Sequence, residues 1–368
     1  MGGKLRKSQR IFEQEIAQAE AEAQAQKQRV LNTVRMLYYE ALGAQHLVDL
    51  RRELAKIARE AVQITAELMN VGQADRPDHL EAEIEAQQVE LELESAENAR
   101  QEVWQLLAAV VGMPSMEPVR LAGNLEEELP ALDQAALLAT LLRDSPEIQS
   151  ARAGVERAQA VLARARAERI PDLFLRGGIG YSTETLELRN GGPDNRVTGP
   201  EASVQVGLNL PIFNRNQGAI AAAQAELAIA ERELQRLELA LRSRLASAFR
   251  QYNTAWRTVQ RYQQQVLPGA RRAYELYLAS FRQMAAAYPQ VLISQRTMFQ
   301  VQDDYVNALV ELRQTAIQIQ GFLLSGGLDA PRVRPFEIGG GEETTLVPLV
   351  PGVFHVKEPA GGREGRQP

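Results

Sequence analysis

Acidic side chains are the densest group of chemically active residues in this sequence. Seven glutamates fall between residues 81 and 97: Glu81, Glu83, Glu85, Glu90, Glu92, Glu94 and Glu97. Carboxylates at this density could attract metal cations, whereas in a helix the same run is typical of a solvated face. The three histidines, His46, His79 and His355, are scattered without ligand spacing. They therefore do not indicate a metal site.

No arrangement of residues typical of catalysis stands out. The sequence has no cysteine, which excludes disulfides and thiolate chemistry. The glycine-rich stretch 177–180 lies inside an alternating pattern rather than before a helix, so it is not a phosphate-binding loop. The formal net charge of −6 argues against nucleic-acid binding. The sequence thus predicts a protein that is not an enzyme and that needs no cofactor.

The elements that carry the acidic run are long helices, and they occur twice. Val34, Tyr38, Ala41 and Leu42 recur at one constant offset as Ala248, Tyr252, Ala255 and Trp256. Pro77 and Leu80 recur at nearly the same offset as Pro289 and Leu292. Such internal repetition indicates a duplicated architecture. The predicted helices span 4–68, 78–111, 145–170, 216–283 and a last segment ending near 324.

The long helix predicted at 216–283 has the most regular pattern of apolar residues. From Leu234 to Val266 its apolar side chains step by three or four residues, which is the spacing of a coiled-coil seam. The intermediate seam members are Leu237, Leu241, Leu245, Ala248, Tyr252, Ala255, Val259 and Tyr262. The predicted fold class is therefore mainly α, built from long coiled-coil hairpins, with a small β part.

Two shorter stretches between the helical copies, 173–183 and 202–213, read as strands. In the second, Val204, Val206, Leu208 and Leu210 alternate with polar or small residues. Period two with one polar face indicates a half-buried strand, and about ten residues is the length that a tilted strand needs to cross a bilayer. We therefore predict that these four side chains face lipid and that 183–201 is an exposed loop.

The junction after the second strand carries a family resemblance. Residues 208–218 read LNLPIFNRNQG, which resembles the strand-to-helix junction of TolC-type outer-membrane efflux channels. Its last five residues, 214–218, are most similar to the branch that serves heavy-metal (cobalt–zinc–cadmium type) efflux pumps. The stretches 145–148 and 171–173 fit the same family's helix entering the barrel. The resemblance covers about residues 3–330.

The resemblance implies a passive exit duct that spans the outer membrane and extends into the periplasm. It implies a homotrimer whose strands share a β-barrel in outer-membrane lipid and whose helices form an α-barrel tunnel. It also implies two partners, a periplasmic adaptor (membrane fusion) protein and an inner-membrane resistance-nodulation-division pump. The junction motif favours divalent metal cations as the transported substrate.

The resemblance also implies a division of the chain into segments. The first copy has no counterpart of 145–213 and a signal peptide is missing, so we expect an N-terminally truncated chain. The expected segments are a first helical hairpin at 1–112, an equatorial connector at 113–144, a helix into the barrel at 145–170, a transmembrane strand pair at 171–213, a second hairpin at 214–330 and a disordered tail at 331–368.

By the same resemblance, the turns at the ends of the two hairpins contact the adaptor. These tips are Asn70, Val71, Gly72 and Gln73 in the first copy, and Phe281, Arg282, Gln283 and Met284 in the second. Just beyond them lie Asp78, Glu81 and Gln290, which threefold symmetry would turn into a ring at the tunnel aperture. An acid at a helix start also simply offsets the helix dipole, so both interpretations stand.

Two other classes of protein could use similar helices. A periplasmic adaptor would need β-rich domains flanking a single hairpin, whereas this sequence predicts two hairpins and only two strands. A soluble coiled-coil scaffold would have no need for the alternation from Val204 to Leu210. Partitioning distinguishes these classes from a channel: a channel needs detergent, whereas a scaffold stays in the soluble fraction.

Overall fold

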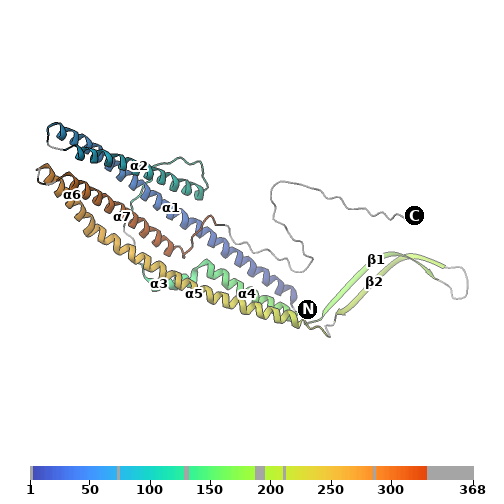
Figure 1. Ribbon diagram of the computed structural model, residues 1–368. Helices are drawn as coiled ribbons and strands as arrows, with labels where there is room; N and C mark the ends of the chain where they lie inside the picture. Colours follow the sequence, from blue (N-terminus) through green and yellow to red (C-terminus); the bar gives the residue numbers. More distant parts are fainter. Residues whose placement is uncertain are drawn as a thin grey trace, which may run out of the picture. The chain divides into compact units, whose positions relative to one another are not determined.

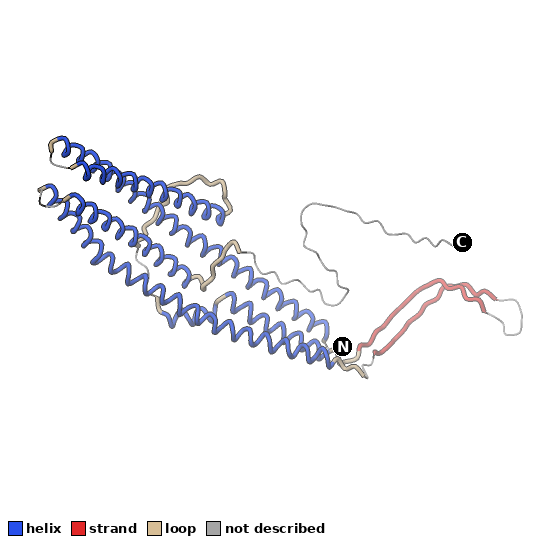
Figure 2. Tube along the Cα trace, in the orientation of Figure 1, coloured by secondary structure: helices blue, strands red, loops and turns tan. Residues whose placement is uncertain are grey.

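The computed structural model describes residues 3–72, 75–127, 132–186, 195–209, 213–283, 285 and 287–329. As predicted, these residues form long helices and one two-stranded sheet (Figures 1 and 2). No described helix carries an apolar stretch long enough to cross a membrane. The expected disordered tail, 331–368, lies outside the described residues.

The elements are α1 (Lys4–Asn70), α2 (Arg76–Val111), α3 (Gln134–Asp144), α4 (Pro146–Ala167), β1 (Asp172–Leu186), β2 (Asn195–Asn209), α5 (Gln217–Arg261), the π-helical η1 (Tyr262–Val266), α6 (Leu267–Arg282) and α7 (Tyr288–Gln320).

The described helices lie side by side, and each packs against at least one other. α1 packs against α2, α4 and α7, while α7 also packs against α5 and α6. α4 lies between α1 and α5. Toward the two turns that end the hairpins the order is therefore α2, α1, α7, α6, and Figure 1 shows both turns at the same end of the helices. This order leaves α2 at one edge and the α5–α6 rod at the other.

The largest apolar cluster lies along the seam of α5, as the spacing predicts. Leu241, Leu245, Ala248, Tyr252 and Ala255 are all buried. Side chains from α3, α4 and α7 complete the cluster, among them Leu141, Ile148 and Leu309. Ala-rich contacts dominate α1, where the buried side chains are mostly small. The periodicity of the sequence thus identifies the core of the second copy correctly.

The rod predicted at 216–283 contains a π turn that the spacing did not predict. Tyr262 packs on the main cluster, and the next residue of the seam is Leu267, five residues later, rather than Val266. Ala270 and Tyr274 then continue the seam. Pro268 is the second residue after η1. Proline has no N–H to donate, and its ring clashes with the carbonyl four residues before it in a regular α-helix. One wider turn removes that conflict and advances the seam by one residue.

The last helix ends earlier than predicted, at Gln320 instead of near residue 324. The buried amide of Asn32 on α1 donates hydrogen bonds of 2.8 Å to the carbonyls of Gly321 and Leu324. These carbonyls follow the last turn of α7, where backbone acceptors have no partner within the helix. A side chain of the first hairpin therefore fixes the end of α7, the last helix of the second hairpin.

α4 begins as predicted, with Ser145 at the N-cap and Pro146 in the first turn. The Ser145 hydroxyl is buried and has no hydrogen-bond partner among the described residues. Glu147, the acid in that first turn, instead pairs with Arg29 of α1 at 3.0 Å and Arg244 of α5 at 3.5 Å. The start of α4 is thus held between its two neighbours by charge.

The two strands pair antiparallel and are longer than predicted. Asp172 lies opposite Asn209 and Leu186 lies opposite Asn195. Residues 183–186 and 195–201, which we predicted as part of an exposed loop, belong to the strands instead, because their backbones continue the same ladder. The remainder of the predicted loop, 187–194, and Leu210 lie outside the described residues.

Candidate functional site: the helical tips and the sheet face

The first tip is a tight turn between α1 and α2. The N–H of Val71 donates to the carbonyl of Glu67 at 3.3 Å, which closes α1, and the Val71 side chain is 67% exposed. Gly72 follows with φ of +75°, a conformation that favours glycine. Gln73, the fourth residue predicted here, lies outside the described residues. The turn thus presents Asn70 and Val71 to solvent.

The second tip has the same place in the duplicate. The N–H of Gln283 donates to the carbonyl of Ala279 at 3.2 Å, and that of Ala285 donates to Ser280 at 2.8 Å. Phe281 is half-buried, whereas Gln283 is exposed. Arg282 ends α6, and Met284 lies outside the described residues.

Two of the three predicted aperture residues cap their own helices. The Asp78 carboxylate accepts from the N–H of Asp75 at 3.4 Å, and the Gln290 carbonyl oxygen accepts from the N–H of Ala287 at 3.2 Å. Each stands at the third position of its helix, so the repeat preserves the capping interaction even though the residue type differs. Glu81 is exposed and has no ion-pair partner in the described part of the chain. Of these three residues, only Glu81 thus has a carboxylate free for another role.

A small apolar cluster beneath the tips joins the two hairpins. Tyr288 and Leu292 of α7 pack with Ala82 of α2, and Phe281 of α6 lies against Tyr288 with ring centroids 5.6 Å apart. Burial, reinforced by the nearby charge of Glu85, raises the pKa of the Tyr288 phenol to about 12. The buried hydroxyl has no hydrogen-bond partner among the described residues. The cluster thus connects helices of both copies directly behind the turns.

Two ion pairs farther from the tips also connect the copies. Arg296 of α7 donates to both carboxylate oxygens of Glu85 on α2, at 2.9 and 3.0 Å from Nε. Glu85 is only 4% exposed, whereas the Arg296 side chain is 57% exposed, so the pair is buried on the carboxylate side alone. Arg51 of α1 pairs with Asp303 of α7 and also with Glu92 of α2 at 2.9 Å. Burial raises the pKa of Asp303 although Arg51 acts in the opposite direction.

Arginines of α1 and α7 pair with four of the seven glutamates of the acidic run. Glu90 pairs with Arg59 at 2.9 Å and Glu97 with Arg52 at 2.6 Å. With the pairs of Glu85 and Glu92, four of the seven glutamates bind arginine. Among the described residues, no group of three acidic, histidine or cysteine side chains is placed to hold a metal ion. The run is therefore mainly an ion-pair ladder between helices, which neither sequence interpretation anticipated.

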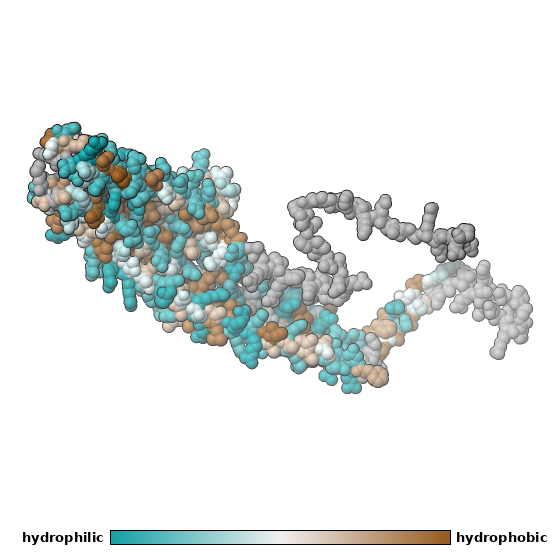
Figure 3. Space-filling view, in the orientation of Figure 1, coloured by the Kyte–Doolittle hydropathy of each residue, from teal (hydrophilic) through white to brown (hydrophobic). Residues whose placement is uncertain are grey.

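The strand pair carries an apolar face and a polar face, as predicted. Leu173 lies opposite Leu208, and Leu175 opposite Val206, so these side chains share one face of the ladder. Val204 lies opposite Gly177 on that face. These apolar side chains are between 51% and 77% exposed. Figure 3 shows apolar and polar residues interleaved along the strands.

Phe174 falls on the polar face, and its partner across the ladder explains why it is tolerated. It lies opposite Gly207, and its ring occupies the space that a Cβ at Gly207 would need. An aromatic ring over a cross-strand glycine covers the exposed backbone there. Any side chain at 207 would displace the ring, so the pair fixes the register of the two strands.

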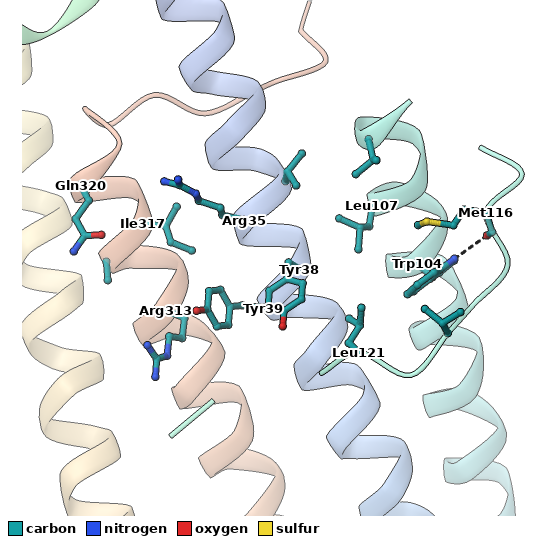
Figure 4. A pocket seen from close by; sticks show the side chains of 14 residues that line it. Arg35, Tyr38, Tyr39, Trp104, Leu107, Met116, Leu121, Arg313, Ile317 and Gln320 are labelled. Carbon is teal, nitrogen blue, oxygen red and sulfur yellow. Dashed lines mark hydrogen bonds between the residues drawn. The ribbon is translucent and has the colours of Figure 1, made fainter. Parts of the chain in front are cut away.

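An apolar cavity of about 680 Å³ lies between α1, α2 and α7, away from the tips (Figure 4). Tyr38 and Tyr39 of α1 and Trp104 of α2 line it, and the Trp104 indole donates to the Met116 carbonyl at 2.9 Å. Arg313 of α7 lies 5.4 Å from the centre of the Tyr39 ring. The repeat counterparts of Tyr38 and Trp104 are Tyr252 and Ala316, both buried in the main cluster. Ala316 also lines this cavity from α7, so helices of both hairpins enclose it.

Comparison with known proteins gives a consistent result. Residues 1–113 and 137–323 match the family described as "Outer membrane efflux protein". The cobalt-zinc-cadmium resistance protein CzcC of Cupriavidus metallidurans is 30% identical over 286 residues, which cover 78% of this chain and 65% of that protein. The chain spans 44% of the length of another curated relative, CyaE of Bordetella pertussis, to which it is 31% identical.

Two solved structures have the same fold. The outer membrane protein VceC of Vibrio cholerae superimposes with a TM-score of 0.72 at 20% identity, covering 89% of this chain and 77% of VceC. CusC, described as undergoing transmembrane channel formation, superimposes with a TM-score of 0.74 at 17% identity, covering 89% of this chain and 75% of CusC. At these identities the match concerns the fold alone.

Proposed function

The chain belongs to the outer membrane efflux protein family, and from this premise we propose that it is a passive exit duct of a tripartite efflux system. Its energy would come from a partner pump, because the described helices carry apolar seams and ion-pair ladders rather than a reactive group. The duct would lie in the outer membrane, with the helices extending into the periplasm.

The observation that carries this proposal is the register of the two strands. It aligns Leu173, Leu175, Val204, Val206 and Leu208 on one exposed face. Arg176 and Gln205 lie opposite each other on the other face. A sheet with lipid on one side and water on the other needs this division, and a soluble scaffold does not.

The two tips support the assignment of partners. Both are short exposed turns at the same end of the helices, and Val71 offers an apolar contact there. Three copies of the chain would present six such turns in a ring. A periplasmic adaptor would bind this ring and connect it to an inner-membrane pump of the resistance-nodulation-division type.

The transported substrate would be a divalent metal cation. This part of the proposal rests on the likeness to the cobalt-zinc-cadmium resistance protein. Glu81 would contribute a ring of three carboxylates near the tip, with Asp78 and Gln290 serving chiefly as caps. Cation selectivity that is unchanged by Glu81→Lys in single-channel recordings would refute this ring.

Membrane insertion is the experiment that tests the duct. Val206→Arg places a charge on the apolar face, and a charge at the centre of a bilayer costs about 2–4 kcal/mol in a membrane strand. We expect the variant to be lost from the outer-membrane fraction and from conductance measurements in planar bilayers. Gln205→Arg is the matched control, because it adds the same charge to the next residue on the polar face.

The comparison of these two variants separates the proposal from a scaffold function. If the chain is a duct, only Val206→Arg fails to insert. Equal behaviour of both variants, or recovery of the unaltered chain in the soluble fraction without detergent, would exclude a duct.

A further inference from the structure

We propose that the open edge of α2 and the open edge of the α5–α6 rod bind each other between neighbouring copies of the chain, through ion pairs. The proposal rests on the ring of copies in the proposed function and specifies which residues close that ring. Within one molecule the edge of α2 and the edge of the α5–α6 rod lie on opposite sides of the helices, with α1 and α7 between them. They can therefore meet only across copies.

The edge of the α5–α6 rod carries arginines without acids. From residue 239 to residue 274 the sequence has seven arginines and no aspartate, glutamate or lysine. In this part of the rod, Arg250 and Arg257 stand two residues before the buried Tyr252 and Val259, so they point away from α7. Arg261 and Arg272 continue the same exposed edge. None of these four arginines is in an ion pair within the described part of the chain.

The edge of α2 offers the complementary groups. Its buried side, which includes Ala86 and Val89, packs against α1 and α7. Of the glutamates on this helix, Glu94 and Glu102 are exposed and have no ion-pair partner among the residues the structure describes. Leu80, Ile84 and Leu91 share the outward side and are 45%, 57% and 66% exposed. An outward stripe of this kind, apolar near the tip and acidic beyond it, is unusual on a helix that faces only water.

The two edges match in height as well as in charge. Glu102 on α2 and Arg257 on the rod both lie about seven helical turns from the tip ends of their helices. Glu94 and Arg261 lie about five and about six turns from the same ends. At about 1.5 Å per residue, the members of each pair therefore differ in height by one helical turn or less. Leu80 and Leu276 match near the tip, since both lie within about two turns of it.

A head-to-tail contact of this kind repeats identically around a closed ring. Each copy offers α2 to one neighbour and the α5–α6 rod to the other, so three copies would form three equal seams. Near the tip the seam would be apolar, through Leu80, Ile84 and Leu276. Farther from the tip it would be charged. The charges would then fix the register of neighbouring copies, since a shifted copy leaves arginines facing each other.

Disulfide crosslinking tests the contact directly, because the chain has no cysteine of its own. The double variant Glu102→Cys with Arg257→Cys, in the full chain in detergent, should form covalent dimers and trimers after mild oxidation. The control pairs Glu102→Cys with Arg236→Cys. Arg236 is exposed on the same rod but lies about six helical turns from Arg257, or about 30 Å, which is far beyond disulfide reach.

Charge exchange tests whether the ion pair matters as well as the proximity. Glu94→Arg and Arg261→Glu should each lower the fraction of trimer about fivefold or more at fixed protein concentration, measured by light scattering. The two changes together should restore it. Both residues are exposed in a single copy, so neither variant is expected to impair folding.

The outcomes separate this proposal from the proposed function. A trimer by light scattering with no crosslink at 102–257 would overturn the seam and leave the duct intact. Crosslinks only to a co-purified adaptor would assign the two edges to that partner and would also overturn the seam. If no trimer forms at all, both the seam and the ring fail.

Discussion

The two helical hairpins of this chain share one architecture but are held together by different chemistry. In the first, charged side chains join α1 to α2, through Arg52 with Glu97 and Arg59 with Glu90. In the second, aromatic rings join the rod to α7: Tyr262 stacks on Tyr305 with centroids 6.5 Å apart, and Phe281 contacts Tyr288. The duplicated backbone therefore does not require one kind of contact between its helices.

The repeat shows that one charged pair of the first hairpin has no charged counterpart in the second. By the offsets of the repeat, Arg52 and Arg59 correspond to Val266 and Ala273, and Glu97 corresponds to Leu309. Both partners of the pair between Arg52 and Glu97 are thus replaced by apolar residues in the second hairpin. Replacing one partner alone would have left an unpaired charge beside an apolar seam, which is costly. The geometry of the hairpin is preserved while the interactions beside its seam change together.

The two copies also differ in how well their cores are covered. Leu245 in the second copy is 2% exposed, whereas its repeat counterpart Leu31 in the first is 41% exposed. α3 and the start of α4 cover α5 there, whereas α1, although it packs against α4, leaves Leu31 partly exposed. Repeat-equivalent positions such as Leu31 and Leu245 thus contribute unequally to the stability of one molecule.

Truncation of this matched pair should give the largest effect. Leu245→Ala removes a buried side chain and should lower the free energy of unfolding by about 2–5 kcal/mol. Leu31→Ala should cost less than about 1 kcal/mol, because much of that side chain is already in contact with water. Urea unfolding of the dissociated chain, followed by circular dichroism, measures both. Equal losses would mean that Leu31 is covered in solution and that the two cores do not differ.

Removal of an arginine from the first hairpin should have a smaller effect that depends on burial. Arg51→Met leaves Asp303 of α7 buried without its cation and should cost about 1–3 kcal/mol at neutral pH. Arg59→Met breaks an exposed pair of the same ladder and should cost up to about 1 kcal/mol. Methionine keeps the apolar stem in both, so the difference reports the charge.

The pH dependence of the Arg51→Met variant gives a second readout. Burial raises the pKa of Asp303 above its ordinary value of 3.8. The folded chain therefore binds this proton more tightly than the unfolded chain, and stability falls as the pH rises through that interval. Without Arg51 the pKa rises further, so the deficit of the variant should shrink as the pH is lowered toward about 4. A deficit that grows on acidification would contradict this assignment.

Periodic patterns allowed the helices and the sheet to be predicted from the sequence. The 67 residues of α1 end within two residues of the predicted limit, because its apolar positions repeat without an internal proline. The alternation from Val204 to Leu208 likewise predicted a strand with one apolar face, and the register confirms it. These features depend on neighbours in the sequence, which a pattern can capture.

Contacts between distant segments could not be predicted in this way. Glu85 and Arg296 are far apart in the sequence, and no local pattern distinguishes Glu85 from the glutamates that face α1. Arg313, which is buried and donates to the Leu125 carbonyl, also lacks a local signal. Pro268 is a local signal near the π turn that the seam spacing did not include, and the seam steps from Tyr262 to Leu267 there. The roles of the two tips stay predictions.

Salt should separate the two hairpins, although by the smallest amount. Exposed ion pairs weaken when the ionic strength rises from about 0.1 to about 1 M, because the screening length falls from about 10 Å to about 3 Å. Contacts between aromatic rings are not weakened in this way. Hydrogen exchange should therefore become faster in the middle of α2, beside Glu90 and Glu97, and change little in α6 beside Tyr274. The difference should correspond to less than about 1 kcal/mol of local stability, since each exposed pair contributes no more than that.

The variant with both Arg52→Met and Arg59→Met provides the control, because α2 should then lose its response to salt. A uniform response along both hairpins would show that the ladder does not stabilise the first one, and that the two copies differ in residue type but not in the forces that join their helices.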